Sequence, residues 1–336
     1  MKIEWVCIPI AFFAAYLIIK WMLRSGAANV AIDSPCARSL HSEAMPRSGG
    51  LGIIVGVTAG WGVLADGSAF HVLIPAAALA AISLLDDIKG LHAGYRLPVH
   101  IVLAGLFVGL TLWPAINIYA AFAAVLAISW MTNLFNFMDG SDGLAGGMAV
   151  SGFGFYALAA FMSGDTGFCM ANLVVASSAA AFLTYNFHPA RIFMGDAGST
   201  FLGFLSGAVG LIGWQKGIWS LWTPFLIFSP FIVDTTLTLL KRLLRGEKIW
   251  KAHREHYYQR LIQMGYGHKK TAILEYFFMV FTGISGCFLP YDAAKWYVIV
   301  FVTIIYLILT STIDIYWQKF IFRKNDLIKN NININI

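Results

Sequence analysis

Charged side chains are scarce in this chain of 336 residues, of which 12% are charged and 59% are hydrophobic. An ordinary soluble domain has roughly 25% charged residues. The mean hydropathy of +0.72 therefore excludes an ordinary soluble domain and indicates that the bilayer is the solvent for most of the chain. The net charge of +6 would suit a nucleic-acid-binding protein, but the basic residues follow membrane topology instead, so we expect no nucleic-acid partner.

Cysteine is also scarce, and the four cysteines are far apart and form no Cys-x-x-Cys motif. This spacing gives no metal site, and we interpret the cysteines as apolar residues within helices. The sequence also lacks internal repeats, coiled-coil heptads and low-complexity linkers. We expect one membrane-embedded domain over residues 1–336, with a cytoplasmic loop at 241–270 and a frayed Asn/Ile-rich tail at 325–336.

Long apolar runs account for most of the chain. A membrane-spanning helix needs about 20 apolar residues. The first run could instead be a signal peptide, but it is longer than the usual h-region of about 7–15 residues and its n-region is nearly uncharged, which favours an uncleaved span. The sequence thus predicts an all-α, polytopic integral membrane protein with about 11 transmembrane helices. The eleven runs are 3–23, 50–66, 69–85, 98–114, 116–132, 144–163, 167–185, 199–214, 218–240, 271–290 and 293–317.

Lysine and arginine are distributed unevenly between the connections. If the chain has eleven spans and an external N-terminus, almost all lysines and arginines of the connections fall on one side of the membrane. Positive charge near span ends marks the cytoplasmic face. We therefore predict an external N-terminus and a cytoplasmic C-terminus. The polar and Gly-rich clusters fall on the same side, which predicts that one face carries the chemistry. The cytoplasmic segments are 24–49, 86–97, 133–143, 186–198, 241–270 and the C-terminal tail.

Asp86 and Asp87 end the third apolar run. Acids at a helix C-terminus oppose the helix dipole, so a purely structural sequence would favour Lys or Arg there. Two adjacent acids can divide a chemical task, one holding a cation or a partner and the other accepting a proton. The alternative is a solvated helix end stabilised by Lys89.

Oxygen-bearing side chains recur every three residues at Asn133, Asn136, Asp139 and Asp142. On a helical or turn-like path this spacing brings them towards one side. Hard oxygen ligands suit Mg²⁺, which binds one or two carboxylates together with substrate phosphates. A calcium-binding EF-hand loop would need a closing bidentate Glu, which is absent. The alternative is a turn that caps the sixth span.

The segment 193–200, Phe-Met-Gly-Asp-Ala-Gly-Ser-Thr, places Asp196 between glycines at the start of another span. Glycines allow close approach of a backbone to a ligand, and the N–H groups at a helix start attract phosphate. The alternative is that Asp196 is only a helix cap.

His253, Arg254 and His256 lie in the most basic loop. Without a third ligand nearby, His-x-x-His is a weak zinc signal. Donation from His and Arg to a phosphate or diphosphate fits better. A generic positive-inside loop would explain the Lys and Arg residues but not the paired histidines. The first loop, residues 33–50, is rich in Pro and Gly, and taken alone it predicts only a turn-rich connection.

The order of these motifs resembles one family over residues 33–261. The motifs are D-x-P-x-x-R-x-L-H with P-R-x-G-G, then D-D, N-x-x-N-x-x-D-G-x-D-G-L-A-G, P-A-R-I-F-M-G-D-A-G-S-T and H-R-x-H-x-x-Q-R-L. They are similar to those of the polyprenyl-phosphate N-acetylhexosamine-1-phosphate transferases, the glycosyltransferase 4 family that includes phospho-MurNAc-pentapeptide transferase. The resemblance implies an enzyme that transfers an N-acetylaminosugar 1-phosphate from a UDP-sugar to undecaprenyl phosphate, releases UMP and requires Mg²⁺, with Mn²⁺ as an alternative cation.

The resemblance also implies roles for individual residues. Asp196 would ligate magnesium with Asn136 as co-ligand, and Asp86 and Asp87 would activate or position the lipid phosphate. The region that lines the nucleotide pocket is matched by Asn133, Asp139 and Asp142, and Asp139 would be one of the catalytic residues. Phe193 would pack against uracil. His253, Arg254 and His256 would contact the sugar diphosphate. Arg96 lies where the family often has a phosphate-contacting Lys, and this match is loose.

Several departures from the family pattern bear on specificity. The acid pair is followed by Ile-Lys-Gly90 and no third Asp, Cys36 stands where Asn is common, and Ser48 stands where Gly is common. The last loop lacks the three consecutive histidines of the muramyl-pentapeptide enzymes. It resembles the branch that initiates O-antigen and other surface polysaccharides in lipopolysaccharide biosynthesis, while a role in peptidoglycan or teichoic-acid synthesis stays open.

The resemblance further implies a multi-pass enzyme of the bacterial inner (cytoplasmic) membrane with its active site on the cytoplasmic face, in contact with membrane lipids; whether it forms a homodimer is open. The rival interpretation is an ion-coupled transporter, because intramembrane acids and broken helices mark ion pathways. Against it, the acids gather at one face and no inverted repeat is visible in the sequence.

Overall fold

The computed structural model describes residues 3–35, 40, 43–64, 69–90, 94, 96–251, 253–289 and 293–334. Within these residues the regular structure is helical apart from an antiparallel ribbon of β1 (Ile32–Asp33) and β2 (Met45–Pro46). The α-helices are α1 (Cys7–Ser25), α2 (Gly50–Leu64), α3 (Ala69–Lys89), α4 (Arg96–Thr111), α5 (Ile118–Met138), α6 (Leu144–Met162), α7 (Thr166–Asn186), α8 (Gly195–Gln215), α9 (Trp222–Ile227), α10 (Ser229–Leu244), α11 (Tyr257–Leu261), α12 (Gly267–Cys287) and α13 (Lys295–Ile334).

Seven helices of the described chain are long and apolar enough to cross a membrane, namely α1, α3, α5, α6, α7, α8 and α13. The helices α2 and α4 are apolar but shorter. The expectation of an all-α, polytopic membrane protein is therefore confirmed. The number of eleven spans and the external N-terminus stay predictions.

The predicted run 218–240 is divided in the structure into α9 and α10, which meet at Phe228. Pro230 has no N–H group, so it cannot donate the helical hydrogen bond that the carbonyl of Leu226 would accept. The Ser229 hydroxyl donates to that carbonyl at 2.7 Å instead. Hydropathy cannot detect this break, because all the residues around it are apolar or small.

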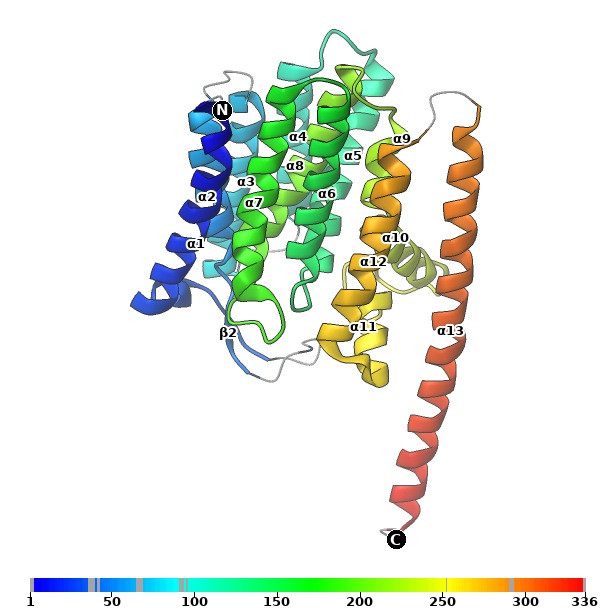
Figure 1. The fold of residues 1–336 in the computed structure, drawn as a ribbon. Helices are drawn as coiled ribbons and strands as arrows, with labels where there is room; N and C mark the ends of the chain where they lie inside the picture. The colour runs from blue at the N-terminus through cyan, green and yellow to red at the C-terminus, as the bar shows by residue number, and fades with distance from the viewer. Residues whose placement is uncertain are drawn as a thin grey trace.

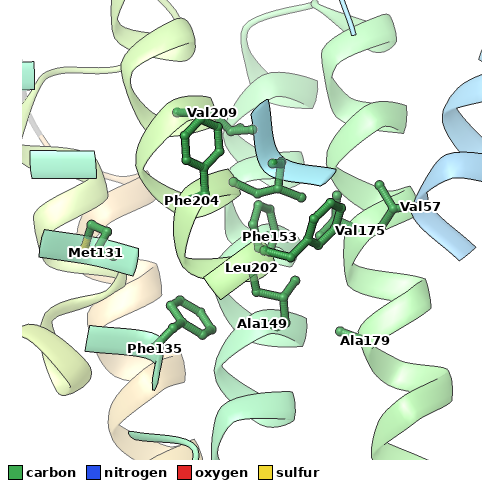
Figure 2. Close-up of a cluster of buried hydrophobic side chains, with 14 of the residues drawn as sticks. Val57, Met131, Phe135, Ala149, Phe153, Val175, Ala179, Leu202, Phe204 and Val209 are labelled. Atoms are coloured by element: carbon green, nitrogen blue, oxygen red, sulfur yellow. The ribbon is translucent and has the colours of Figure 1, made fainter. Parts of the chain in front are cut away.

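Helix α8 lies at the centre of the bundle, and α13 lies at its edge (Figure 1). The share of buried residues in their most apolar windows is 78% for α8 and 17% for α13. Figure 2 shows how the core forms: Leu202, Phe204 and Val209 of α8 pack among side chains of α5, α6 and α7. The start of α8 is thereby held firmly at one end of the bundle.

A stripe of glycines on α2 lets three helices approach closely. Gly52, Gly56 and Gly60 recur every four residues and therefore share one face of the helix. A Cβ atom on Gly56 would lie 2.7 Å from the Ala11 carbonyl oxygen of α1 and 2.6 Å from the Ser178 hydroxyl of α7. Membrane helices associate through such small residues because lipid supplies no hydrophobic drive between helices.

Replacing Gly56 with Ala should lower the thermal unfolding temperature in detergent, because the new methyl group meets backbone that cannot move aside. Overpacking of this kind typically costs about 1–3 kcal/mol. Gly62 on the same helix is the matched control, since a Cβ there would meet no described atom within 4 Å. Gly62→Ala should leave the unfolding temperature unchanged or raise it, and equal effects of the two substitutions would contradict the close-packing account.

Candidate active site

A cavity of about 520 Å³ lies at the end of the bundle where α3 and α5 end and α8 begins. The structure brings nine of the residues singled out from the sequence to its walls. Three others, Asp87, Asp142 and Arg254, are not among the described residues that line it. Those that line it are Asp86, Arg96, Asn133, Asn136, Asp139, Phe193, Asp196, His253 and His256.

Asp196 is held by donors from two other helices. Its Oδ1 accepts a hydrogen bond from Asn136 Nδ2 at 2.8 Å, and its Oδ2 lies 3.0 Å from Arg96 Nη1. Arg96 also reaches Asp86, with 2.5 Å between Arg96 Nε and Asp86 Oδ2. One guanidinium group thus bridges two carboxylates from α3 and α8. This arrangement gives Arg96, which was only a loose match to the family motif, a central place in the site.

Asp87 lies behind the cavity wall, with its side chain fully shielded from solvent. Its Oδ2 accepts hydrogen bonds from the backbone N–H groups of Asp196 at 3.0 Å and Ala197 at 3.4 Å. A carboxylate at a helix N-terminus is favoured by the helix dipole. The two adjacent acids therefore differ in place: Asp86 faces the cavity, and Asp87 caps α8 and fixes the position of Asp196.

The first loop, from which the sequence suggested only a turn, forms part of the site. The Phe193 N–H donates to the Pro46 carbonyl at 2.8 Å, and the Gly49 N–H donates to the Phe193 carbonyl at 2.9 Å. A Cβ on Gly50 would lie 2.2 Å from the Gly198 Cα. The adjacent glycines 49 and 50 were the signal available in the sequence, because two together often mark a close approach of backbones.

Arg47 comes from the same loop and pairs with Asp87. Arg47 Nη1 lies 3.4 Å from Asp87 Oδ1, and Nη2 donates to the Asp87 carbonyl at 2.9 Å. Arg47 also lines the cavity. Arg47 belongs to the P-R-x-G-G motif, from which no role was expected for it, and it is the second guanidinium group among the acids.

Asp139 follows the last residue of α5, between Asn136 and the turn at Gly140. Burial raises the pKa of its carboxyl well above the usual value, and the negative charge of Asp196 raises it further, while a hydrogen bond from the Gly195 amide opposes the shift. A carboxyl group with a raised pKa holds or accepts a proton more readily near neutral pH. Asp139 is therefore the acid of this cavity best suited to proton transfer.

Asp142 lies on another side of the turn that follows α5. Its Oδ2 accepts hydrogen bonds from His188 Nδ1 at 2.7 Å and from the Ala190 N–H at 3.1 Å. These contacts join the start of α6 to the loop between α7 and α8. The nucleotide-binding role implied for Asp142 stays a prediction. Spacing of three residues brought Asn133, Asn136 and Asp139 to one cavity, but the turn at Gly140 directs the next acid away.

The basic loop before α11 closes the cavity from another side. His253 and His256 line the cavity, whereas Arg254 lines a neighbouring groove with Arg242, Lys248 and Lys251. Burial, followed by the proximity of His256 and Arg242, lowers the pKa of His253 to about 4. At neutral pH His253 is therefore uncharged, and it can accept as well as donate a hydrogen bond.

The oxygen-rich wall of the cavity suits a magnesium ion that is shared with a substrate. Asp86 Oδ1 is buried with no hydrogen-bond partner among the described residues. Among the residues that the structure describes, no group of three or more His, Cys, Asp or Glu side chains could hold a metal ion by itself. Magnesium is commonly held by one or two carboxylates plus substrate phosphates, and the residues fit that arrangement. The Asn136 amide presents its nitrogen to Asp196, so a role as co-ligand would require the amide to rotate.

The pKa of His253 predicts how stability depends on pH. The folded protein takes up this proton at a pH of about 4, whereas the unfolded chain takes it up near 6.5. Between these values the unfolded state binds more protons, so the thermal unfolding temperature in detergent should fall as the pH is lowered from about 6.5 to about 4. His253→Gln should make this fall smaller while matching the native protein at pH 7.5, and an unchanged slope would contradict the assignment.

Comparison with known proteins gives the site a family. Residues 69–213 match the model of glycosyl transferase family 4, and this segment contains Asp86, Asp87, Asp139 and Asp196. A probable undecaprenyl-phosphate N-acetylglucosaminyl 1-phosphate transferase of Bacillus subtilis (strain 168) is 32% identical over 89% of this chain and 90% of its own. A decaprenyl-phosphate N-acetylglucosaminephosphotransferase of Mycolicibacterium smegmatis is 27% identical over 80% and 76%.

A phospho-N-acetylmuramoyl-pentapeptide-transferase of Staphylococcus aureus is more distant, with 29% identity over 50% of this chain and 51% of its own. The B. subtilis relative matches most of the chain, well beyond the segment that the family model covers. The family resemblance of the ordered motifs is thereby confirmed. The chain is a member of glycosyl transferase family 4.

Proposed function

We propose that this protein transfers an N-acetylaminosugar 1-phosphate from a UDP-sugar to undecaprenyl phosphate and releases UMP. The observation that carries the proposal is the two-sided cavity. Leu79, Ile82 and Leu97 of α3 and α4 form an apolar wall, and aspartates, arginines and histidines from helix ends and loops form the polar wall. A site of this kind suits a reaction between a lipid-borne phosphate and a water-soluble sugar nucleotide. The names of the B. subtilis and M. smegmatis relatives support the same reaction class.

In the proposed reaction an oxygen of the lipid phosphate attacks the β-phosphorus of the UDP-sugar. A new P–O bond forms, and the bond from the β-phosphorus to the oxygen shared with the α-phosphate breaks, so that UMP leaves with that oxygen. Arg96 and Arg47 are placed to hold the charged phosphate groups against the acids. Asp139, whose pKa is raised by burial, accepts the proton of a lipid phosphate that arrives as the monoanion.

Magnesium, when bound, would neutralise the diphosphate and favour departure of UMP. Asp196 and Asp86 would hold it, with Asn136 as the further ligand implied by the family motif. The position of Asp196 is maintained by the hydrogen bonds from its own backbone and that of Ala197 to Asp87. Asp87 therefore contributes by positioning.

The sugar nucleotide would occupy the polar side of the cavity. We assign the diphosphate to His253, His256 and the neighbouring groove at Arg254, because these side chains offer the donors that phosphate accepts. Phe193 and Asn133 at the cavity wall are assigned to the nucleotide. Asp142 would act on the nucleotide site through the turn that it fixes to His188.

We further propose that the enzyme resides in the bacterial cytoplasmic membrane, with this cavity on the cytoplasmic side, and that it initiates an O-antigen-type polysaccharide. A peptidoglycan or teichoic-acid role is the second candidate, supported by the similarity to phospho-N-acetylmuramoyl-pentapeptide-transferase. A transporter would place its acids near the bilayer midplane. In this protein the acids Asp86, Asp139 and Asp196 that line the cavity lie at or next to helix ends, at one end of the bundle.

The purified protein in detergent should move radiolabel from a UDP-sugar into an organic-extractable lipid when undecaprenyl phosphate and MgCl₂ are supplied. A panel of UDP-GlcNAc, UDP-GalNAc, a UDP-linked N-acetylated deoxysugar and UDP-MurNAc-pentapeptide identifies the donor, and UMP release measured in parallel establishes which bond is broken. Labelled lipid from UDP-MurNAc-pentapeptide alone would favour the second candidate. Absence of labelled lipid and UMP with every donor would overturn the proposed function.

Asp196→Asn should reduce turnover by about a hundredfold or more, because an uncharged amide binds magnesium more weakly than a carboxylate does. This loss corresponds to roughly 2.7 kcal/mol of barrier. Turnover measured across a MgCl₂ titration should also saturate at a higher magnesium concentration. The matched control is Asp165→Asn, since Asp165 caps α7 and pairs with Lys216 at the opposite end of the bundle. Native magnesium dependence in Asp196→Asn would refute its role as a ligand.

A further inference from the structure

Asp234 of α10 was not singled out from the sequence, yet it is one of the most engaged acids in the protein. It is 5% exposed. Its Oδ1 accepts hydrogen bonds from His256 Nδ1 at 3.1 Å and from the Tyr257 N–H at 2.9 Å, and its Oδ2 accepts one from the Tyr258 N–H at 3.0 Å. One carboxylate therefore holds both the backbone at the start of α11 and the imidazole of His256.

A capping role for Asp234 would explain the two backbone contacts but not the contact with the ring. The start of α11 is also held by a second capping hydrogen bond, in which the His256 N–H donates to Gln259 Oε1 at 3.1 Å. The His256 and Gln259 side chains together form a capping box at this helix start. The contact of the imidazole with Asp234 is additional to that box, and capping of α11 does not require it.

Three aromatic rings surround the imidazole of His256. The Phe137 ring stacks on it at a centroid distance of 6.1 Å and the Tyr258 ring at 5.9 Å, with interplanar angles of 27° and 17°. The His253 ring lies 4.9 Å away. The Tyr258 hydroxyl donates to the Phe137 carbonyl at 3.2 Å, which ties the two stacking residues together. Stacking therefore fixes the tilt of the ring, and the hydrogen bond to Asp234 fixes its rotation within the ring plane.

The orientation of the ring determines which nitrogen is available to a ligand. His256 lines the cavity, and its Nδ1 is engaged by Asp234, so Nε2 is the nitrogen left for a ligand there. A carboxylate at Nδ1 keeps the proton on that atom. Nε2 is therefore the atom through which His256 contacts a ligand in the cavity.

We infer that Asp234 is a positioning residue for substrate: it holds His256 so that Nε2 faces the sugar nucleotide in the cavity. The inference rests on the proposed function, and it adds a residue from α10, which lies outside the segment matched by the family model. Carboxylate partners of this kind typically change affinity or activity by about 10–100-fold when they are removed from metal-bound histidines, and we expect an effect of that order here.

A double-mutant cycle separates positioning from structure. Asp234→Asn should raise the KM for the UDP-sugar by about tenfold or more and leave the KM for undecaprenyl phosphate nearly unchanged. In a His256→Ala background the same substitution should have little further effect, because its partner is already gone. An equal factor in both backgrounds, or a rise in both KM values, would show that Asp234 acts only on the fold and would overturn the inference.

Two variants guard against loss of folding. Asn117→Ala removes a comparable cap, the side chain that accepts from the Ala120 N–H at the start of α5, and should leave both KM values unchanged. Thr238→Val removes only the Thr238 hydroxyl that donates to Asp234 Oδ1 at 3.3 Å. If Asp234→Asn does not fold, Thr238→Val should raise the donor KM in the native background and not with His256→Ala, and equal effects in both would overturn the inference.

Nitrogen NMR tests the geometry without any assay of transfer. In protein labelled with ¹⁵N-histidine, the His256 signals are those lost in His256→Ala, and they should show a protonated Nδ1. Asp234→Asn should shift them towards the Nε2–H tautomer and leave the other histidines unchanged. Unshifted His256 signals would overturn the inference even if transfer occurs, whereas shifted signals without transfer by the native protein would leave the geometry intact and overturn the proposed function.

Discussion

Repulsion between carboxylates is the constraint on which this structure depends. Asp86, Asp87, Asp139 and Asp196 meet at one end of an apolar bundle, where the dielectric constant is low. Two unit charges 4 Å apart interact by about 4 kcal/mol at an effective dielectric constant of 20. Such a group of acids is stable only if the fold supplies positive charge or protons at the same place.

The fold supplies both from elements that are distant in sequence. Arg96 at the start of α4 bridges Asp86 and Asp196, and Arg47 from the first loop pairs with Asp87. The N-terminus of α8 directs two N–H groups at Asp87. Asp139 receives no such guanidinium partner among the described residues, and burial, followed by the negative charge of Asp196, raises the pKa of its carboxyl. Three of the acids thus lie beside guanidinium or helix N–H groups, and Asp139 is left as the proton acceptor of the proposed reaction.

The glycines around α8 follow from this arrangement. The loop that carries Arg47 must reach the start of α8 closely enough for backbone hydrogen bonds at 2.9 Å. The contact between Gly50 and Gly198 allows that approach, since a Cβ on Gly50 would lie 2.2 Å from the Gly198 Cα. Small residues are therefore required here for an electrostatic reason, whereas those on α2 serve the packing of helices.

The sequence was sufficient for the apolar spans and for most acids of the site, because hydropathy and short motifs are local properties. It was not sufficient where the outcome depends on contacts between distant segments. The break at Phe228 depends on a missing N–H at Pro230, within a run whose hydropathy predicts a single span. Asp234 lies in a predicted apolar run, and its role depends on its hydrogen bond with His256, which is 22 residues further along the chain. Arg47 could be recognised only once α3 and the first loop were placed together.

Asp142 shows the limit of a spacing argument. A period of three predicts a shared face while the backbone stays helical, and α5 remains helical to Met138. Beyond that point the chain turns, and Asp142 pairs with His188 in place of facing the cavity. The motif is continuous in sequence but divides in space into a cavity-lining part and a part that fixes a neighbouring loop. A family motif alone cannot make that distinction, because it records residue types without the path of the backbone.

Arg96 forms the ion pairs that the proposed chemistry would have to rearrange. Its guanidinium group pairs with the carboxylates of Asp86 and Asp196, the same groups to which we assign magnesium. A cation on these oxygens would compete with Arg96, and a displaced guanidinium group needs a new anionic partner. The phosphate groups that arrive with the substrates supply that partner. Binding of the cation and binding of phosphate are therefore expected to favour each other. The cation displaces Arg96 from the carboxylates, and the phosphate gives Arg96 a new anionic partner.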